Sequence, residues 1–217
     1  MPSPDAELRL SARGLRCRRG GRRVFAGLSF ELRPGEVLEL RGANGSGKTS
    51  LLRLLAGLAQ PSGGALHWQG RPLLPGDAAY ACDMAYLGHL NGVNADLTAA
   101  ENLHFAQRLA GGAGACADPA AALQAWGLAA LAAQPARRLS QGQRRRLALA
   151  RVWMGRRRLW LLDEPCAALD SAGERLFDTR LAEHLQAGGA AIVATHHALT
   201  VPSAHLRRLD LDALAPC

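Results

Sequence analysis

RGANGSGKTS, residues 41–50, fits the pattern G-x-x-x-x-G-K-[ST] without a mismatch between Gly42 and Thr49. Residues 36–40 before it predict a short strand, and residues 48–58 after it have the apolar spacing of a helix. Glycines let the N–H groups of such a loop turn inward around phosphate oxygens, and the helix N-terminus adds its positive dipole end. The stretch therefore predicts a phosphate-binding loop. We expect every motif position to take part: Gly42, Ala43, Asn44, Gly45, Ser46, Gly47, Lys48 and Thr49.

Lys48 is the only lysine among the 26 basic residues (Lys and Arg) of the chain. A compact ammonium on a flexible stem fits the crowded turn between phosphates, whereas a planar guanidinium is broader and demands a bidentate approach. In this motif the lysine reaches the β- and γ-phosphates, and the Thr49 hydroxyl ligates Mg²⁺. The alternative is a chance glycine-rich turn with a leftover lysine, which the flanking strand and helix argue against. We predict that the loop binds a nucleoside triphosphate with Mg²⁺.

LWLLDEP, residues 159–165, predicts a buried parallel strand that ends in two acidic residues. Asp163 stands where the acid of a Walker B strand holds the metal. Glu164 follows directly and is expected to point toward the γ-phosphate, where a carboxylate can orient and polarise the attacking water. The alternative is an acidic turn that caps a buried strand. The phosphate loop in the same chain favours the catalytic interpretation.

The charge balance is basic, with 26 Lys and Arg against 18 Asp and Glu and a formal net charge of +8. This balance is compatible with binding to nucleic acid, to an acidic membrane surface or to a polyanionic ligand, and it does not distinguish among these partners. The arginine clusters lie far apart and lack interleaved aromatic residues, so we interpret most of them as solvated surface. They are residues 18–19, 22–23, 144–146 and 156–158.

The cysteines do not have the spacing of a zinc site or of covalent haem attachment, because no C-x-x-C occurs. We expect reduced, mostly buried thiols. The N-terminal residues lack the apolar core of a signal peptide, and nowhere do roughly 18 uninterrupted apolar residues occur. Any role at a membrane is therefore expected to be peripheral. The cysteines are Cys17, Cys82, Cys116, Cys166 and Cys217.

Strands and helices are predicted to alternate along the chain, which favours an α/β fold with a parallel sheet. Thr98 and Glu101 form a T-x-x-E capping box that opens a helix, and Ser171 and Glu174 are expected to open another in the same way. There is no internal repeat and no linker. We therefore expect one domain over residues 1–217, with a helical insertion near residues 90–150.

LSQGQ, residues 139–143, resembles the LSGGQ signature of ATP-binding cassette (ABC) ATPases. The phosphate loop, helical insertion, signature, acidic strand and a later histidine also occur in the order of that family. The resemblance implies a P-loop NTPase fold with a RecA-like parallel-sheet core, a small antiparallel β subdomain and the helical insertion. It covers nearly the whole chain and implies ATP as the nucleotide.

The resemblance also implies a homodimer that sandwiches two ATP molecules. In the family, Ser140, Gly142 and Gln143 would contact the γ-phosphate of the ATP that the other protomer holds. Asp170, in the D-loop-like stretch PCAALD, would lie near the dimer seam. His196 matches the switch histidine that holds the γ-phosphate and the attacking water. The neighbouring His197 would point to the other side of an extended strand.

Two positions depart from the family pattern. Arg19 stands where an aromatic residue often stacks on adenine, so either Arg19, as a cation over the base, or Phe25 would take that role. His89 stands where the family has a glutamine that helps to hold Mg²⁺. Imidazole is a poor ligand for this hard cation, so His89 is expected to meet water or the interface with a membrane partner.

YLGH, residues 86–89, and GVNADLTAAENLHF, residues 92–105, are similar to the ATP-binding subunits of bacterial cytochrome c maturation systems, described as ATPases of a haem exporter. This resemblance implies ATP hydrolysis by Lys48, Glu164 and His196, with Thr49 and Asp163 as the metal ligands. It implies CcmB-like and CcmC-like integral membrane partners and a peripheral place on the cytoplasmic side of the inner membrane.

Three alternatives stay open. The first is an ATPase for another transported substrate, such as a lipid, peptide or metal complex. The second is a nucleic-acid-linked ABC ATPase, which is disfavoured because those proteins usually carry two cassettes or a long coiled-coil insertion, so no nucleic acid is expected as a partner. The third is a non-hydrolytic cassette, which the intact Asp163, Glu164 and His196 argue against. The chain shows no recognisable set of haem ligands.

Overall fold

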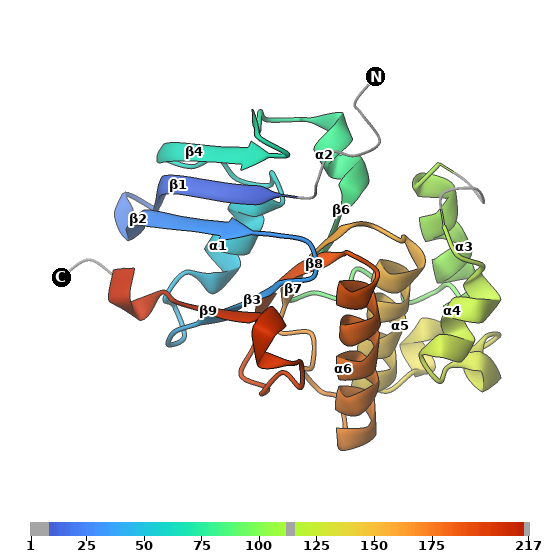
Figure 1. Cartoon of the computed structure of the whole chain (residues 1–217). Helices are drawn as coiled ribbons and strands as arrows, with labels where there is room; N and C mark the ends of the chain where they lie inside the picture. The colour runs from blue at the N-terminus through green and yellow to red at the C-terminus, as the bar shows by residue number, and fades with distance from the viewer. Residues whose placement is uncertain (1–8, 112–115, 215–217) are drawn as a thin grey trace.

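Two β-sheets organise the chain, as the computed structural model shows for the described residues, 9–111 and 116–214. A five-stranded sheet of parallel pairs has the order β6-β7-β8-β3-β9, and a four-stranded sheet of antiparallel pairs has the order β2-β1-β4-β5 (Figure 1). The first consists of β3 (Val37–Arg41), β6 (Met84–Leu87), β7 (Leu159–Asp163), β8 (Ala190–Ala194) and β9 (Leu206–Asp210). The second consists of β1 (Leu10–Arg19), β2 (Arg22–Leu32), β4 (Gly63–Trp68) and β5 (Arg71–Pro72). The predicted combination of a parallel core and a small antiparallel sheet is confirmed.

The central parallel strands β7 and β8 are mostly apolar because both faces of the sheet are covered there. Every residue of β7 and β8 is buried. Successive side chains of β7 point to opposite faces, so Leu159 and Leu161 belong to one apolar cluster, and Trp160 and Leu162 belong to the other. The sheet thus separates two layers of core.

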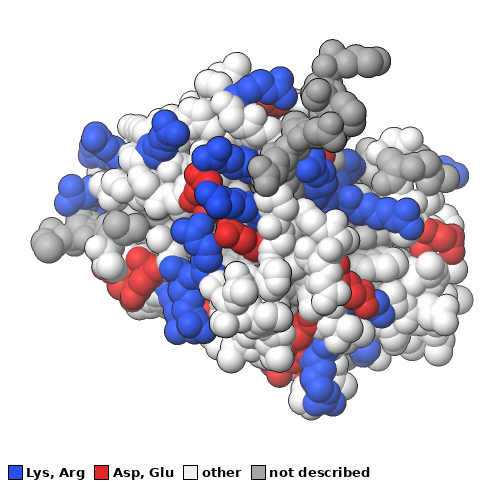
Figure 2. All heavy atoms as spheres, viewed as in Figure 1, with Lys and Arg blue, Asp and Glu red and all other residues white. Residues whose placement is uncertain are grey.

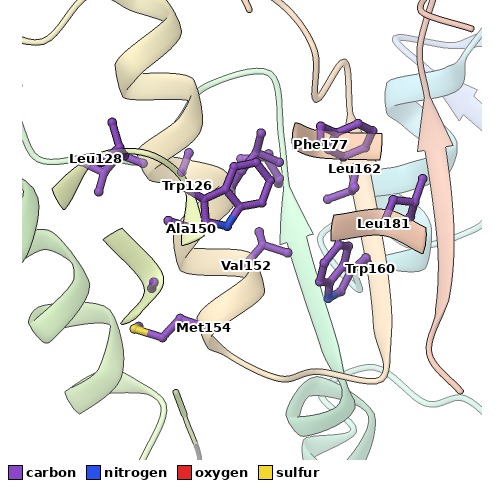
Figure 3. Packing of buried hydrophobic residues seen from close by; sticks show 14 of the residues in the cluster. Trp126, Leu128, Ala150, Val152, Met154, Trp160, Leu162, Phe177 and Leu181 are labelled. Atoms are coloured by element: carbon purple, nitrogen blue, oxygen red, sulfur yellow. The ribbon is translucent and has the colours of Figure 1, made fainter. Parts of the chain in front are cut away.

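Helices α1 (Lys48–Leu55), α5 (Gln141–Met154) and α6 (Ser171–Gln186) cover these faces. Helix α1 packs with the antiparallel sheet in one cluster, while α5 and α6 pack in the other. In that second cluster Trp160 and Leu162 lie between α5 and α6 (Figure 3). Helix α1, which follows the glycine-rich loop, and helix α5, which carries the signature-like stretch, therefore lie on opposite faces of one sheet.

The helical insertion contains α3 (Ala99–Leu109), α4 (Pro119–Ala125) and the beginning of α5, at one end of the molecule (Figure 1). The capping box of α3 is confirmed: the Glu101 N–H donates to Thr98 Oγ1 across 3.2 Å, and the Thr98 N–H donates to Glu101 Oε2 across 2.7 Å. Helix α2 (Ala78–Asp83), capped by Asp77, was not predicted. Among the described residues, no helix combines the length and the apolar character that crossing a membrane requires.

Basic and acidic side chains are interspersed on the face seen in Figure 2. Glu31 pairs with Arg9 across 2.7 Å and with Arg33 across 2.9 Å, and these hydrogen bonds lower the pKa of its carboxyl group. Arg208 pairs in the same way with the buried Glu39. These three arginines are therefore partly neutralised by neighbouring acids.

Candidate functional site

The loop between β3 and α1 has a backbone that requires glycine at two positions. Gly42 has φ of 139°, and a Cβ there would lie 2.5 Å from Ser46 Oγ. Gly47 has φ of 105°, and a Cβ there would lie 2.5 Å from a methyl group of Val24. Any larger side chain would both clash and occupy a conformation that L-residues rarely adopt. The spacing of the motif thus follows from the path of the loop.

Lys48 lies at the first position of α1, with 8% of its surface exposed. Its Nζ donates hydrogen bonds to the Gly42 carbonyl across 2.6 Å and to the Ala43 carbonyl across 3.1 Å. The N-cap residue of α1, Gly47, supplies no side-chain cap, and Ser46 Oγ is buried without a hydrogen-bond partner. A helix N-terminus without a side-chain cap, a buried hydroxyl and an ammonium group converge on one loop. These groups fit a phosphate, which accepts from all of them.

Thr49 and Asp163 bring this loop to the end of β7. Thr49 Oγ1 donates a hydrogen bond to Asp163 Oδ2 across 2.8 Å, and Asp163 is 2% exposed. A hydroxyl and a carboxylate are oxygen ligands of the kind that Mg²⁺ prefers. The two predicted metal ligands are therefore adjacent and fit this cation.

Glu164 and His196 lie together beyond the ends of β7 and β8. Glu164 Oε1 lies 3.5 Å from His196 Nε2, and their side chains are 26% and 65% exposed. Glu164 has φ of 49°, and its N–H donates to the Ala194 carbonyl of β8 across 2.8 Å. The acid and the histidine that were expected to hold the attacking water are thus neighbours.

Ser140 and Gln143 form a capping box at the start of α5. The Gln143 N–H donates to Ser140 Oγ across 3.1 Å, and the Ser140 N–H donates to Gln143 Oε1 across 2.8 Å. A Cβ on Gly142 would lie 2.7 Å from the Ala168 carbonyl, so only glycine fits beside the loop after β7. The described hydrogen bonds include none between these signature residues and the phosphate loop of the same chain.

The family model for ABC transporters matches residues 25–167, which contain the phosphate loop, the signature and the end of β7. This chain belongs to the ABC transporter family. The membership of this family that the resemblance predicted is therefore confirmed.

Curated relatives support the same assignment. The protein from Cupriavidus necator named cytochrome c biogenesis ATP-binding export protein CcmA is 53% identical over 201 residues, which cover 93% of this chain and 88% of that protein. A second CcmA, from Cupriavidus metallidurans, is 50% identical over 211 residues, 97% of this chain and 100% of that protein. A solved ATP-binding subunit of an ABC transporter superposes with a TM-score of 0.76 at 22% identity, over 86% of this chain and 79% of that one. This last likeness shows the ABC fold.

The D-loop-like stretch, residues 165–170, ends at the cap of α6. Asp170 is the N-cap residue, since its Oδ1 accepts the Gly173 N–H across 2.8 Å. The predicted capping box of Ser171 and Glu174 is therefore wrong by one residue. Aspartate caps at least as well as serine, and the sequence offered both. Asp170 remains exposed on the surface.

The two departures from the ABC pattern have different outcomes. Phe25 is fully buried next to Gly47, so the expectation that it stacks on adenine is wrong. Arg19 is exposed at the end of β1 and keeps the role as a proposal. His89 is exposed directly after Gly88, beyond the end of β6, where it can meet water or a partner.

Two residues of the site were missed. Arg145 was grouped with a solvated cluster, but it is 3% exposed and contacts the turn after β7. Arg145 lies three and four residues before the buried Ala148 and Leu149 on α5, and this helical spacing was the local indication that Arg145 is buried too. Asp212 accepts the Ala43 N–H of the phosphate loop across 2.9 Å. No local pattern points to a contact across 169 positions.

Proposed function

We propose that this ABC ATPase hydrolyses ATP to drive a membrane transporter that handles haem in cytochrome c biogenesis. The observation that carries hydrolysis is the Glu164–His196 pair at 3.5 Å, beside an Asp163 that bonds to Thr49. The relatives from Cupriavidus necator and Cupriavidus metallidurans are named cytochrome c biogenesis ATP-binding export proteins, and these names support the biological process. The transported substrate itself is a proposal from those names.

The residues divide the reaction among them. Lys48 binds the β- and γ-phosphates, and its ammonium exchanges the loop carbonyls for phosphate oxygens. Thr49 and Asp163 would hold Mg²⁺, which neutralises charge on the phosphates. Glu164 orients the attacking water and accepts its proton, while His196 contacts both the γ-phosphate and that water. The water oxygen attacks the γ-phosphorus in line with the bond to the bridging oxygen, that bond breaks, and ADP and inorganic phosphate are released.

We further propose that two copies close around two ATP molecules. Ser140 is exposed, and Gly142 and Gln143 are partly exposed at the start of α5. A helix N-terminus attracts anionic phosphate oxygens. The described hydrogen bonds include none between the N-terminus of α5 and the phosphate loop of the same chain. The ATP bound to a second protomer would supply the phosphate for this helix end, and Asp170 would lie near the dimer interface. The site is thus expected to be complete only in the dimer.

The membrane partners are proposed to be CcmB-like and CcmC-like subunits that dock on the cytoplasmic side of the inner membrane. A cavity of about 520 Å³ lies between α3 and the end of α5, lined in part by Phe105, Leu109 and Val152. Phe105 is 56% exposed, Leu109 is 74% exposed, and Leu90 of the neighbouring loop is 83% exposed. Exposed apolar residues that form one contiguous patch are typical of protein contact sites, and Phe105 and Leu109 line the same cavity.

Replacement of Glu164 by Gln tests the hydrolytic mechanism. We expect the variant to bind ATP with near-normal affinity but to lose at least about 10²-fold in turnover, because an amide cannot accept the proton. Size-exclusion chromatography with ATP should then show a stable dimer. Turnover at the normal rate would show that the assigned base is wrong.

Co-purification from membranes tests the transporter assignment. We expect the tagged chain to retain integral membrane subunits of a cytochrome c assembly complex, and Phe105→Glu with Leu109→Glu to release them while ATP binding persists. Recovery of a different set of membrane subunits would favour an ABC ATPase for another substrate.

A further inference from the structure

Arg145 is a buried cation at the centre of the site that the mechanism above does not use. It lies on α5, in the second turn after the signature serine Ser140, and is 3% exposed. Its guanidinium donates to oxygen atoms from two loops that are far apart in the sequence. The acceptors are the carbonyls of Asp163 at 2.6 Å, Glu164 at 2.7 Å, Pro165 at 3.1 Å and Gly88 at 3.2 Å, and Asn91 Oδ1 at 2.9 Å.

This arrangement suits a guanidinium and no other side chain. Burial lowers the pKa of Arg145, and the nearby charge of Asp163 acts in the opposite direction. Arginine nevertheless stays protonated in proteins, so the charge must be satisfied where it lies. The planar fork donates several hydrogen bonds in fixed directions, whereas the ammonium of a lysine is a compact point charge. Arg145 therefore holds three consecutive carbonyls in one orientation.

The carbonyls that Arg145 holds belong to a strained turn. Glu164 has φ of 49°, in the left-handed region that non-glycine residues rarely occupy. Such a conformation persists only where the surroundings fix it. The Glu164 N–H is fixed by the Ala194 carbonyl of β8, and its carbonyl is fixed by Arg145. These two bonds set the direction in which the Glu164 carboxylate leaves the turn.

Arg145 also reaches the loop after β6. The Gly88 carbonyl and the Asn91 amide oxygen accept from its Nη1, on either side of His89 and Leu90. A second arginine of α5, Arg151, donates to the Asn91 carbonyl across 2.9 Å. The helix that begins at the signature is thus bonded to the turn of the proposed base and to the loop beside the apolar cavity.

We infer that Arg145 is a positioning residue that couples the signature helix and the loop after β6 to the orientation of Glu164. Helix α5 moves when the signature binds a nucleotide or when the neighbouring loop binds a partner. The guanidinium transmits this movement to the turn at residues 163–165. The inference rests on the proposed role of Glu164 as the residue that orients water. Arg145 itself touches no substrate.

The test compares Arg145→Lys and Arg145→Ala with Arg144→Ala, in the membrane complex that the wild-type chain forms. Arg144 is the preceding residue of α5 and has no side-chain hydrogen bond to the turn in the described structure. We expect kcat to fall at least about tenfold in both Arg145 variants, since displacements near 1 Å in a site lower rates by up to about 10²-fold. The Kd for ATP should change by less than about threefold. Arg144→Ala should keep the wild-type kcat.

Hydrogen exchange supplies a readout that does not depend on turnover. In Arg145→Lys, which retains the charge, peptides over residues 159–170 should exchange faster, while peptides over residues 42–55 should exchange as in the wild type. Wild-type kcat and exchange in Arg145→Lys would overturn the inference, as would equal loss of kcat in Arg144→Ala. An active Glu164→Gln variant would instead overturn the proposed base, so the two failures can be told apart.

Discussion

The Thr49 hydroxyl donates a hydrogen bond to the Asp163 carboxylate across 2.8 Å, although 114 positions separate the two residues. Thr49 is the second residue of α1, the helix that follows β3, whereas Asp163 ends β7, and β8 separates β3 from β7 in the sheet. Both are proposed to hold Mg²⁺, and the proposed metal site would then lie between the phosphate loop and the proposed base.

Thr49→Val should raise the Mg²⁺ concentration needed for half-maximal ATPase activity by about tenfold. The isosteric side chain removes one ligand, and it leaves a buried Asp163 oxygen without its donor. Mg²⁺ titrations of the ATPase rate measure the effect. Thr179→Val on α6 removes a hydroxyl that, within the described residues, donates to the Arg175 carbonyl, and it should leave the titration unchanged. An unchanged titration in Thr49→Val would argue against its role as a ligand.

Lys48→Arg should weaken ATP binding by at least about tenfold although the charge is kept. The ammonium of Lys48 fits between the loop carbonyls at 2.6 Å and 3.1 Å, where a wider guanidinium would have to displace the loop. Equilibrium binding of a fluorescent ATP analogue gives the Kd. Arg53→Lys, later on the same helix, is the control. Near-normal affinity in Lys48→Arg would show that charge alone is required.

His196→Ala and His197→Ala should have different effects. His196 lies 3.5 Å from Glu164, and its loss should lower kcat by about 10²-fold, as for other groups that act on the transition state. His197 faces α6, where its Nε2 lies 3.2 Å from Asp178 Oδ2. Its loss leaves a buried carboxylate without this partner and should lower the free energy of unfolding by about 1–3 kcal/mol. ATPase assays per folded molecule and urea denaturation separate the two. Reversed effects would contradict the assignment.

Asp212→Ala should weaken ATP binding by about two- to tenfold, which corresponds to the loss of one hydrogen bond. Asp212 holds the Ala43 N–H and thereby one end of the phosphate loop. Asp212→Asn keeps an acceptor oxygen and should bind ATP almost as the wild type does. If both variants lost the same affinity, the charge of Asp212 rather than its hydrogen bond would be responsible.

His184 should make the protein less stable in acid. Burial lowers its pKa from 6.5 to about 4, against the opposing effect of its bond to the Ala190 carbonyl, and its ring stacks on Trp160 with centroids 3.9 Å apart. Between these two values the unfolded chain binds the proton more readily than the folded chain does. The stability that neutral His184 provides is therefore present above pH 6.5 and falls by up to roughly 1.4 kcal/mol per pH unit as the pH decreases toward 4.

Urea denaturation of the wild type and of His184→Phe at pH 7 and pH 5 measures this effect. Phenylalanine can stack on Trp160 but does not titrate. We expect the difference in unfolding free energy between the two proteins to shift in favour of the variant at pH 5. A difference that stays constant between the two pH values would show that His184 titrates normally in the folded protein.

Local patterns accounted for the features whose physical cause lies within a few residues. The phosphate loop follows from the glycine spacing around Lys48, and β7 and β8 follow from short apolar runs that end in polar residues. The cap of α3 follows from Thr98 and Glu101. The cap of α6 shows the limit of this approach, because Asp170 and Ser171 are both good caps and the path of the preceding turn selects one.

The phosphate loop, the signature-like stretch and the acidic strand could be recognised from the sequence because each is a contiguous motif, and their order predicted the ABC family. Which of these motifs contact one another depends on the tertiary structure. It buried Phe25, it placed Asp212 on the phosphate loop, and it turned Arg145 from an apparent surface charge into a contact of the Glu164 turn. Contacts between distant residues depend on how the sheet orders its strands, and no single stretch of the chain contains that information.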